Sequence, residues 1–247
     1  MSIESPADFE GMSRVGHAVA AALKAMSEYV RPGVSTAEVD GVGAQVLRQH
    51  GARSAPQMFY GFPGVNLISV NDEVVHGVPG DRMLLPGDLV TLDVTAELDG
   101  YVADAARTIP LPPYSEITAE LCRCARAAFE KATAVARAGR PIHCIGKAVE
   151  QEVRESGFAV VRELGGHGVG RHIHETPFIS NVFKPTDTQP LTDGLVLTIE
   201  PIIAERSGRI FEDDDGWTIR TVDGGLSAHY ENTVVIRTGV PILLTAA

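Results

Sequence analysis

Two aspartates in β-prone sequence are the first residues whose spacing could do chemistry. Two runs of β-forming residues flank Asp99-Gly100, a dipeptide typical of two-residue hairpin turns. With that turn, Thr95 lies opposite Asp104, and Asp93 shares their face because side chains alternate along a strand. The two carboxylates should then be diagonal neighbours, with Cβ atoms within about 8 Å. Carboxylates this close repel each other unless they are protonated or bridged by cations.

Two further acids stand in similarly apolar β-prone sequence. Glu200 ends the run that begins at Leu195, and Glu231 precedes the run 232–236. The alternative is that all these acids are solvated on an exposed sheet face, but an unpaired charge in an apolar strand is costly. We therefore expect one buried cluster, whose four negative charges two divalent metal ions would balance. Its members are Asp93, Asp104, Glu200 and Glu231.

Some of the eight histidines could reach such a cluster. His167 lies among glycines that would let its imidazole enter a crowded site, and imidazole binds metals such as Mn, Fe, Co or Zn. His174 follows shortly after it, and His76 precedes a Gly/Pro turn. For each of these taken singly, a structural role is the alternative. The others read as surface residues on helices or caps (His17, His50, His143) or stay ambiguous (His172, His229).

The elements that would position these residues recur along the chain. Gly33 matches Gly139 and Gln45 matches Gln151, each pair 106 positions apart, without a gap between them. Each copy reads as a long helix, a Gly or Pro break, a second helix and then β-prone sequence. Accidental matching of alanine-rich helices is the alternative. The repeat predicts two αα-then-β halves, related by pseudo-symmetry around one shared site and connected through residues 111–115.

The predicted helices carry two smaller signals. Ser35 or Thr36 could cap the second helix, above Glu38. The cysteines are too few for a disulfide framework and lack the spacing of a zinc site, so we interpret them as core residues of helices. They are Cys122, Cys124 and Cys144.

Length and charge exclude several classes of protein. The 247 residues suit one large domain or two small ones, and 21 Lys and Arg against 32 Asp and Glu give a net charge of −11. That charge opposes a protein whose main task is to coat DNA or RNA. The first residues lack the basic and apolar regions of a secretory signal, and no apolar stretch approaches the roughly 20 residues of a membrane span. These features favour a soluble protein of a reducing compartment, the cytoplasm.

The order of the motifs resembles that of the type I methionine aminopeptidases, which belong to metallopeptidase family M24. The resemblance covers nearly the whole chain. It implies the α/β (α+β) pita-bread fold, with two pseudo-symmetric αα-β halves around a central antiparallel sheet. Residues 1–247 would form a single catalytic domain with an internal pseudo-repeat, roughly 9–110 and 115–240. The motif residues are His76, Asp93, Asp104, His167 (in Gly166-His167-Gly168), His174, Glu200 (in Thr198-Ile199-Glu200-Pro201) and Glu231.

The resemblance also implies roles for these residues, position by position. Two divalent metal ions (Co, Mn, Fe or Zn) would be held by Asp93, Asp104, His167, Glu200 and Glu231. The catalytic residues would be His76, His174 and Glu200, of which the two histidines would also contact substrate. An apolar pocket for methionine would be lined by Phe59, Phe62 and Trp217.

The activity that the resemblance implies is removal of the N-terminal methionine from peptides and nascent proteins with a small second residue, by a hydroxide that two metal ions activate. The partner would be the N-terminus of a peptide or nascent chain, with transient ribosome contact and no membrane contact, and the enzyme would be a monomer. One alternative is an X-Pro aminopeptidase or prolidase on the same fold, although such enzymes usually carry a substantial extra N-terminal domain. Another is a metal-free binding module, although this chain keeps all five ligand positions.

Four positions depart from the pattern of that family. Asn232 stands where His is usual, and His229 stands where Gln is usual. Ile173 replaces an aromatic residue or Met, and Leu67 replaces a smaller residue or Cys. None of the four is a position at which the family binds metal. They therefore bear on the substrate pocket and the rate, and we expect the metal site to be unaffected.

Overall fold

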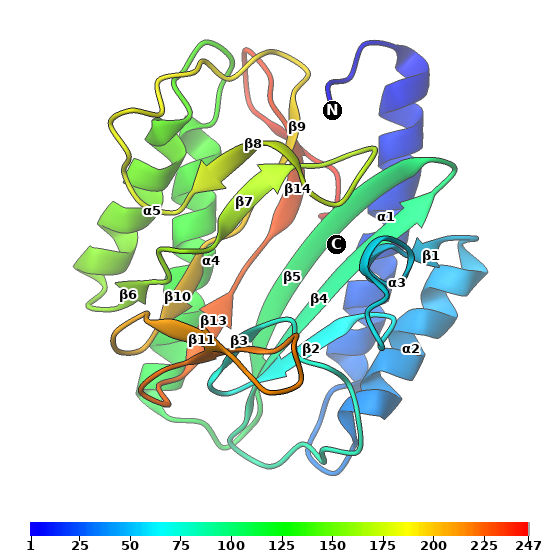
Figure 1. The fold of residues 1–247 in the computed structure, drawn as a ribbon, viewed down its shortest axis with the longest axis vertical. Coiled ribbons are helices and arrows are strands. Elements are labelled where there is room, and N and C mark those ends of the chain that lie inside the picture. The colour runs from blue at the N-terminus through cyan, green and yellow to red at the C-terminus, as the bar shows by residue number, and fades with distance from the viewer. Residues whose placement is uncertain (247) are drawn as a thin grey trace.

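Two pairs of helices flank the strands, and each pair comes from one half of the sequence (Figure 1). The computed structural model describes residues 1–246. The helix ends lie 106 positions apart, as the repeat predicts: Tyr29 and Val135 end the first helices, Gln49 and Glu155 the second. The pairs are α1 (Pro6–Tyr29) with α2 (Thr36–Gln49), and α4 (Glu116–Val135) with α5 (His143–Glu155).

The break inside each helix pair depends on a glycine in the left-handed region. Gly33 has φ 87° and Gly139 has φ 84°, which glycine adopts without steric cost. The helix after the first break begins with a capping box: the Ser35 hydroxyl accepts from the Glu38 N–H, and the Glu38 carboxylate accepts from the Ser35 N–H. Of the two candidate caps, the structure therefore uses Ser35.

A long antiparallel hairpin turns at Asp99-Gly100, as predicted. Both turn residues have positive φ, 51° and 81°, which this two-residue turn requires. Thr95 lies opposite Asp104, so the predicted register is confirmed, and Asp93 and Asp104 share one face of the ribbon. The hairpin strands are β4 (Leu89–Leu98) and β5 (Tyr101–Pro110), and β4 also pairs with β1 (Arg53–Ser54) and β2 (Leu67–Val70).

A five-stranded sheet from the second half packs against the second helix pair and shares a core with it. Within this sheet Ile199 lies opposite Asn232. Glu200 and Glu231 immediately adjoin these two residues, so the register brings both acids to the same end of the paired strands. The strand order is β15 (Ile242–Leu243), β14 (Asn232–Val235), β9 (Val196–Ile199), β7 (Gly165–Gly168) and β8 (Glu175–Ser180).

Two small sheets and the short helix α3 (Ala55–Tyr60) complete the fold. Arg220 forms ion pairs with Asp72 at 3.0 Å and with Glu73 at 2.9 Å, which fix the strand that leads to His76. One sheet has the order β13 (Ser227–His229), β10 (Ile202–Ala204) and β6 (Ala159–Val160). The other has the order β11 (Ile210–Glu212), β12 (Ile219–Thr221) and β3 (Glu73–Val75).

Hydrogen bonds between β5 and residues 231–233 join the two halves of the chain. The Thr233 hydroxyl accepts from the Asp104 N–H at 2.9 Å and donates to the Asp104 carbonyl at 2.8 Å. The Glu231 N–H donates to the Ala106 carbonyl at 2.9 Å. The segment that carries Glu231 is therefore held directly against the strand that carries Asp104.

The cysteines and the helix lengths agree with the sequence. All three cysteines are free and lie on α4 and α5, with Cys124 and Cys144 buried and Cys122 half-buried. No helix among residues 1–246 combines the length and hydrophobicity that crossing a membrane would require.

Replacing Thr233 by Val should destabilise the junction between the halves. The change keeps the shape of a fully buried side chain but leaves the N–H and carbonyl of Asp104 without the hydroxyl partner. We expect the free energy of unfolding to fall by about 2–4 kcal/mol, measured by denaturant titration. Thr238→Val, at an exposed position on the same chain segment, is the control. Equal losses for the two variants would contradict this assignment.

Candidate metal centre

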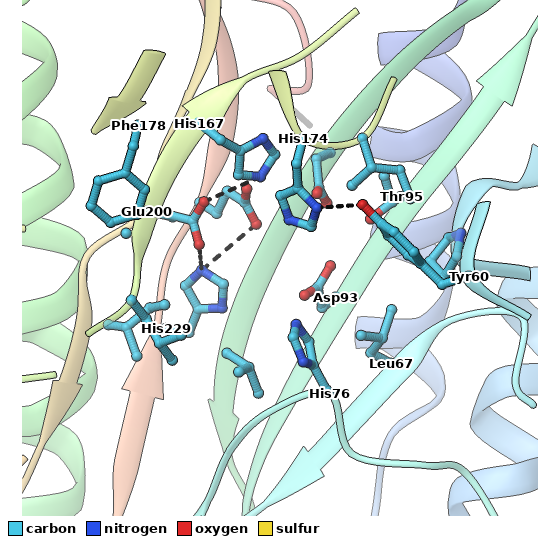
Figure 2. Close-up of a pocket in the computed structure, with 18 of the residues that line it drawn as sticks. Tyr60, Leu67, His76, Asp93, Thr95, His167, His174, Phe178, Glu200 and His229 are labelled. Atoms are coloured by element: carbon cyan, nitrogen blue, oxygen red, sulfur yellow. Dashed lines mark hydrogen bonds and ion pairs between the residues drawn. The ribbon is translucent and has the colours of Figure 1, made fainter. Parts of the chain in front are cut away.

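A cavity of about 550 Å³ opens between strands of the two halves (Figure 2). Its lining includes seven residues with predicted metal or catalytic roles and two of the three predicted pocket residues. The seven are His76, Asp93, Asp104, His167, His174, Glu200 and Glu231, and the two are Phe62 and Trp217. Residues far apart in the sequence are thus brought to one cavity.

Four carboxylates line this cavity. Asp93 and Asp104 face it from the hairpin, and Glu200 and Glu231 face it from the ends of β9 and β14. The ligand atoms of Asp104, His167 and Glu231 all lie within 4.8 Å of one another. The cluster predicted from the apolar strands is therefore present as a spatial arrangement.

Several buried oxygens of these carboxylates have no hydrogen-bond partner. Among residues 1–246, no hydrogen bond reaches Oδ1 of Asp93, Oδ1 of Asp104 or Oε1 of Glu231, although all three atoms are buried. Burial and the neighbouring carboxylates raise the pKa of Asp93 and of Glu231 well above their usual values. Burial likewise raises the pKa of Asp104 to about 6 and that of Glu200 well above its usual value. Because like charges and desolvation both oppose ionisation, the site favours positively charged ligands.

His167 enters the cluster from β7, where its two neighbours must be glycines. A Cβ atom on Gly166 would lie 2.3 Å from the Thr198 carbonyl oxygen, and one on Gly168 would lie 2.4 Å from the Thr176 carbonyl oxygen. The ring Nδ1 of His167 is 3.0 Å from the Gly168 carbonyl oxygen, to which it can donate. Burial lowers the pKa of His167 to about 4, so the neutral ring keeps a lone pair on Nε2 for a metal ion.

Thr198 aligns two of the candidate ligands. Its hydroxyl accepts from the His167 N–H at 3.0 Å and donates to Oε1 of Glu200 at 2.8 Å. His167 Nε2 lies 3.5 Å from the same Glu200 oxygen. The Thr198 side chain therefore orients Glu200 relative to the backbone of His167.

His76 and His174 line the cavity next to Asp93, across from Glu200 (Figure 2). His76 has φ 60°, and the following Gly77 packs so closely that a Cβ there would be 2.2 Å from the Ile68 carbonyl oxygen. Burial and the nearby His174 lower the pKa of His76 to about 4. The ring of His174 stacks edge-on against His167 with 4.4 Å between ring centroids.

Tyr60 is a cavity residue that the sequence analysis did not identify. Its hydroxyl lies 2.6 Å from Nδ1 of His174. When the phenol donates this hydrogen bond, the proton of the neutral imidazole is on Nε2, which can then donate to another group. The three aromatic residues among positions 59–62 were the available signal, but they did not show which ring faces the site.

The apolar wall of the cavity contains Phe62 and Trp217, as expected, but not Phe59. Phe62 and Trp217 meet edge to face with 5.2 Å between ring centroids. Phe59 instead packs against the hydrophobic core that α1, α2 and the β4–β5 hairpin share, and its ring lies 5.4 Å from that of His172. Successive residues of a helix point about 100° apart, so α3 directs Tyr60 to the cavity and Phe59 away from it.

The four departures from the family pattern fall in different places. Leu67, Ile173 and His229 line the cavity, so they bear on the site directly. Asn232 does not line it: its Oδ1 accepts a hydrogen bond at 3.0 Å from the hydroxyl of Thr245, inside the sheet. Burial, with the neighbouring histidines, lowers the pKa of His229 to about 3.

Comparison with known proteins agrees with this architecture. Residues 10–238 match the family model described as metallopeptidase family M24. The chain is 42% identical over 247 residues to methionine aminopeptidase 2 of Bacillus subtilis, covering 99% of each protein. The crystal structure of methionine aminopeptidase from Thermotoga maritima matches with a TM-score of 0.97 and 34% identity, over 100% of each chain.

A prolidase is a more distant match. The prolidase from Pyrococcus furiosus has a TM-score of 0.79 at 23% identity, and 65% of its chain is covered. This likeness shows a shared fold alone, whereas the match to the methionine aminopeptidases extends over their full length. The chain therefore belongs to metallopeptidase family M24 and, within it, to the methionine aminopeptidases.

Proposed function

We propose that this enzyme removes the N-terminal methionine from peptides and nascent proteins whose second residue is small. The observation that carries the proposal is the cavity itself, in which a buried cluster of acids and histidines adjoins an apolar wall. The names of the full-length relatives support methionine release over the cleavage of Xaa-Pro substrates.

The family implies divalent metal, and the residues present fit it. Buried carboxylate oxygens without partners and a neutral imidazole are the donors that Mn, Fe, Co and Zn accept. We propose two such ions in each chain. When bound, they would supply Lewis acids that activate water at neutral pH and stabilise negative charge on the substrate carbonyl. The residues that would hold them are Asp93, Asp104, His167, Glu200 and Glu231.

The side chains around the cluster have distinct tasks in this proposal. Glu200 accepts the proton from the attacking water, since the Thr198 hydroxyl holds its carboxylate in place. His174, held by Tyr60, donates from Nε2 to the carbonyl oxygen as negative charge develops there. His76, which directly follows β3, steadies the scissile amide nitrogen.

The apolar wall explains a preference for methionine. Phe62, Trp217, Leu67 and Ile173 present rings and branched chains, and a thioether packs favourably against aromatic rings. Each methylene of the substrate side chain that such a pocket buries discriminates by about 1–3 kcal/mol.

We propose further that residues 1–247 act as one catalytic domain, because both halves of the chain contribute residues to a single cavity, and that the enzyme acts as a monomer. A task on nascent chains places the enzyme in the cytoplasm, in transient contact with the ribosome. The wild-type enzyme should then co-sediment only weakly with ribosomes and elute as a monomer on gel filtration.

A panel of peptides, assayed with the wild type and with a variant that lacks one proposed metal ligand, tests the proposed activity. The metal-loaded enzyme should release Met from Met-Ala-Ser, and release it poorly from peptides with a large second residue. His167→Ala should lower kcat/KM by more than about 100-fold and also weaken metal binding, because it removes a nitrogen ligand. His17→Ala, on the exposed side of α1, is the control. Full turnover and full metal content in His167→Ala would refute the ligand assignment, and preferred cleavage of Xaa-Pro peptides would refute the substrate.

The stability of the metal-free protein tests the buried carboxylates. The pKa of Asp104 is raised from 3.8 to about 6, so its contribution to stability is complete below about pH 4 and is lost as the pH rises through about 6. In metal-free protein, Asp104→Asn should therefore gain stability over the wild type between pH 4 and pH 7. The expected gain is several degrees in Tm, since one pKa unit corresponds to about 1.4 kcal/mol and 1 kcal/mol to about 2–4 °C.

Calorimetry at the two pH values measures this difference. Asp81→Asn, at an exposed position, should differ from the wild type in Tm by the same amount at both pH values. Adding Co²⁺ should raise the Tm of the wild type more than that of Asp104→Asn. A difference between Asp104→Asn and the wild type that does not change with pH would contradict the assigned burial.

A further inference from the structure

His229 is a buried histidine inside the acidic cluster that none of the roles above uses. It ends β13, and its side chain is 2% exposed. Its Nε2 atom lies 3.6 Å from Oε2 of Glu200 and 3.6 Å from Oε2 of Glu231 (Figure 2). Neither ring nitrogen has a hydrogen-bond partner in the part of the chain that the structure describes. A buried polar ring without partners is costly unless another group occupies the space that it faces.

The distances from this ring do not correspond to hydrogen bonds. Hydrogen bonds from nitrogen to oxygen span about 2.7–3.2 Å, and 3.6 Å exceeds that range. Two ligands that share one ion, each about 2.1 Å from it at a tetrahedral angle, lie about 3.4 Å apart. The separation of 3.5 Å between His167 Nε2 and Oε1 of Glu200 is of the same kind. Nε2 of His229 and Oε2 of Glu231 therefore have the spacing of two ligands that share one ion.

The grouping of ligand atoms agrees with this spacing and adds Asp93 to it. The ligand atoms of Asp93, His229 and Glu231 lie within 4.8 Å of one another, as do those of Asp104, His167 and Glu231. The two groups share Glu231, and each contains one further carboxylate and one histidine. The cavity thus offers two similar donor sets on either side of one bridging residue.

Hydrogen bonds to Thr108 fix the backbone of His229 beside the cluster. The Thr108 hydroxyl on β5 accepts from the His229 N–H at 2.7 Å and donates to the His229 carbonyl at 3.0 Å. A second threonine, Thr91, lies 2.7 Å from the same hydroxyl. The backbone of His229 is therefore anchored to the strand that carries Asp104.

We propose that His229 is a metal ligand, so that each of the two metal positions receives one imidazole nitrogen. The inference rests on the proposed metal centre and differs from the expectation that this departure leaves that centre unaffected. Because imidazole suits Co, Zn and Fe while carboxylate and water suit Mn, a second nitrogen shifts the preference of the enzyme towards Co and Zn.

X-ray absorption on the zinc-loaded protein tests this assignment directly. With two equivalents of Zn²⁺, the wild type should show about one imidazole per zinc, and His229→Gln about half that number, because His229 contributes one of the two rings. His143→Gln, at a half-buried position outside the cavity, is the matched control and should keep the wild-type count. The wild-type spectrum is informative alone, so the test does not depend on the folding of His229→Gln.

Calorimetric titration of metal-free protein provides a second readout. His229→Gln should weaken Co²⁺ binding at one of the two positions by about 10–100-fold. The same variant should weaken Mn²⁺ binding by less than about 5-fold, because Mn²⁺ gains less from a nitrogen donor.

The outcomes separate this proposal from the proposed function. If the wild type binds two Zn²⁺ and releases methionine but has only half an imidazole per zinc, the role of His229 is overturned while the activity stands. Equal imidazole counts in the wild type and His229→Gln overturn it in the same way. If the wild type binds no metal, both proposals fail together.

Discussion

Mutual repulsion among four enclosed carboxylates is the constraint on which the rest of this structure depends. The strands hold Asp93, Asp104, Glu200 and Glu231 around one cavity, where burial and like charge both oppose their ionisation. Neither sheet could assemble this set alone, since the hairpin supplies two acids and the sheet of the second half supplies the other two. The fold must therefore hold two sheets together at the point where their side chains repel.

The hydrogen bonds between β5 and residues 231–233 meet that requirement. They involve backbone groups and the Thr233 hydroxyl, which carry no net charge, so they are unaffected by the ionisation of the acids beside them. The same strand anchors His229 through Thr108. One strand thus fixes the relative positions of candidate ligands from both halves of the chain, which is the precision that a metal centre requires.

Local features of the chain could be predicted from the sequence, and features set by packing could not. Asp99-Gly100 determines the hairpin, so alternation alone placed Asp93 and Asp104 on one face. The helix breaks were similarly visible at glycines that adopt positive φ. Helix α3 has only six residues, too few for a periodic pattern that would show which of its faces is turned towards the cavity. The sequence therefore did not show that Tyr60, and not Phe59, lines the cavity. The position of His229 beside Glu200 depends on pairing between strands that are distant in the sequence. The spacing of residues along the chain does not show which of these strands pair.

The residues that hydrogen-bond to β5 lie near the end of the sequence, and this has a consequence for biosynthesis. Ribosomes release the N-terminal half first, so the edge of β5 between Asp104 and Thr108 is complete while residues 229–233 are still to be made. An unpaired edge of an alanine-rich strand invites pairing with other chains. Until residues 229–233 emerge, the chain exposes this strand edge, and we expect it to be prone to pairing with other chains during that interval.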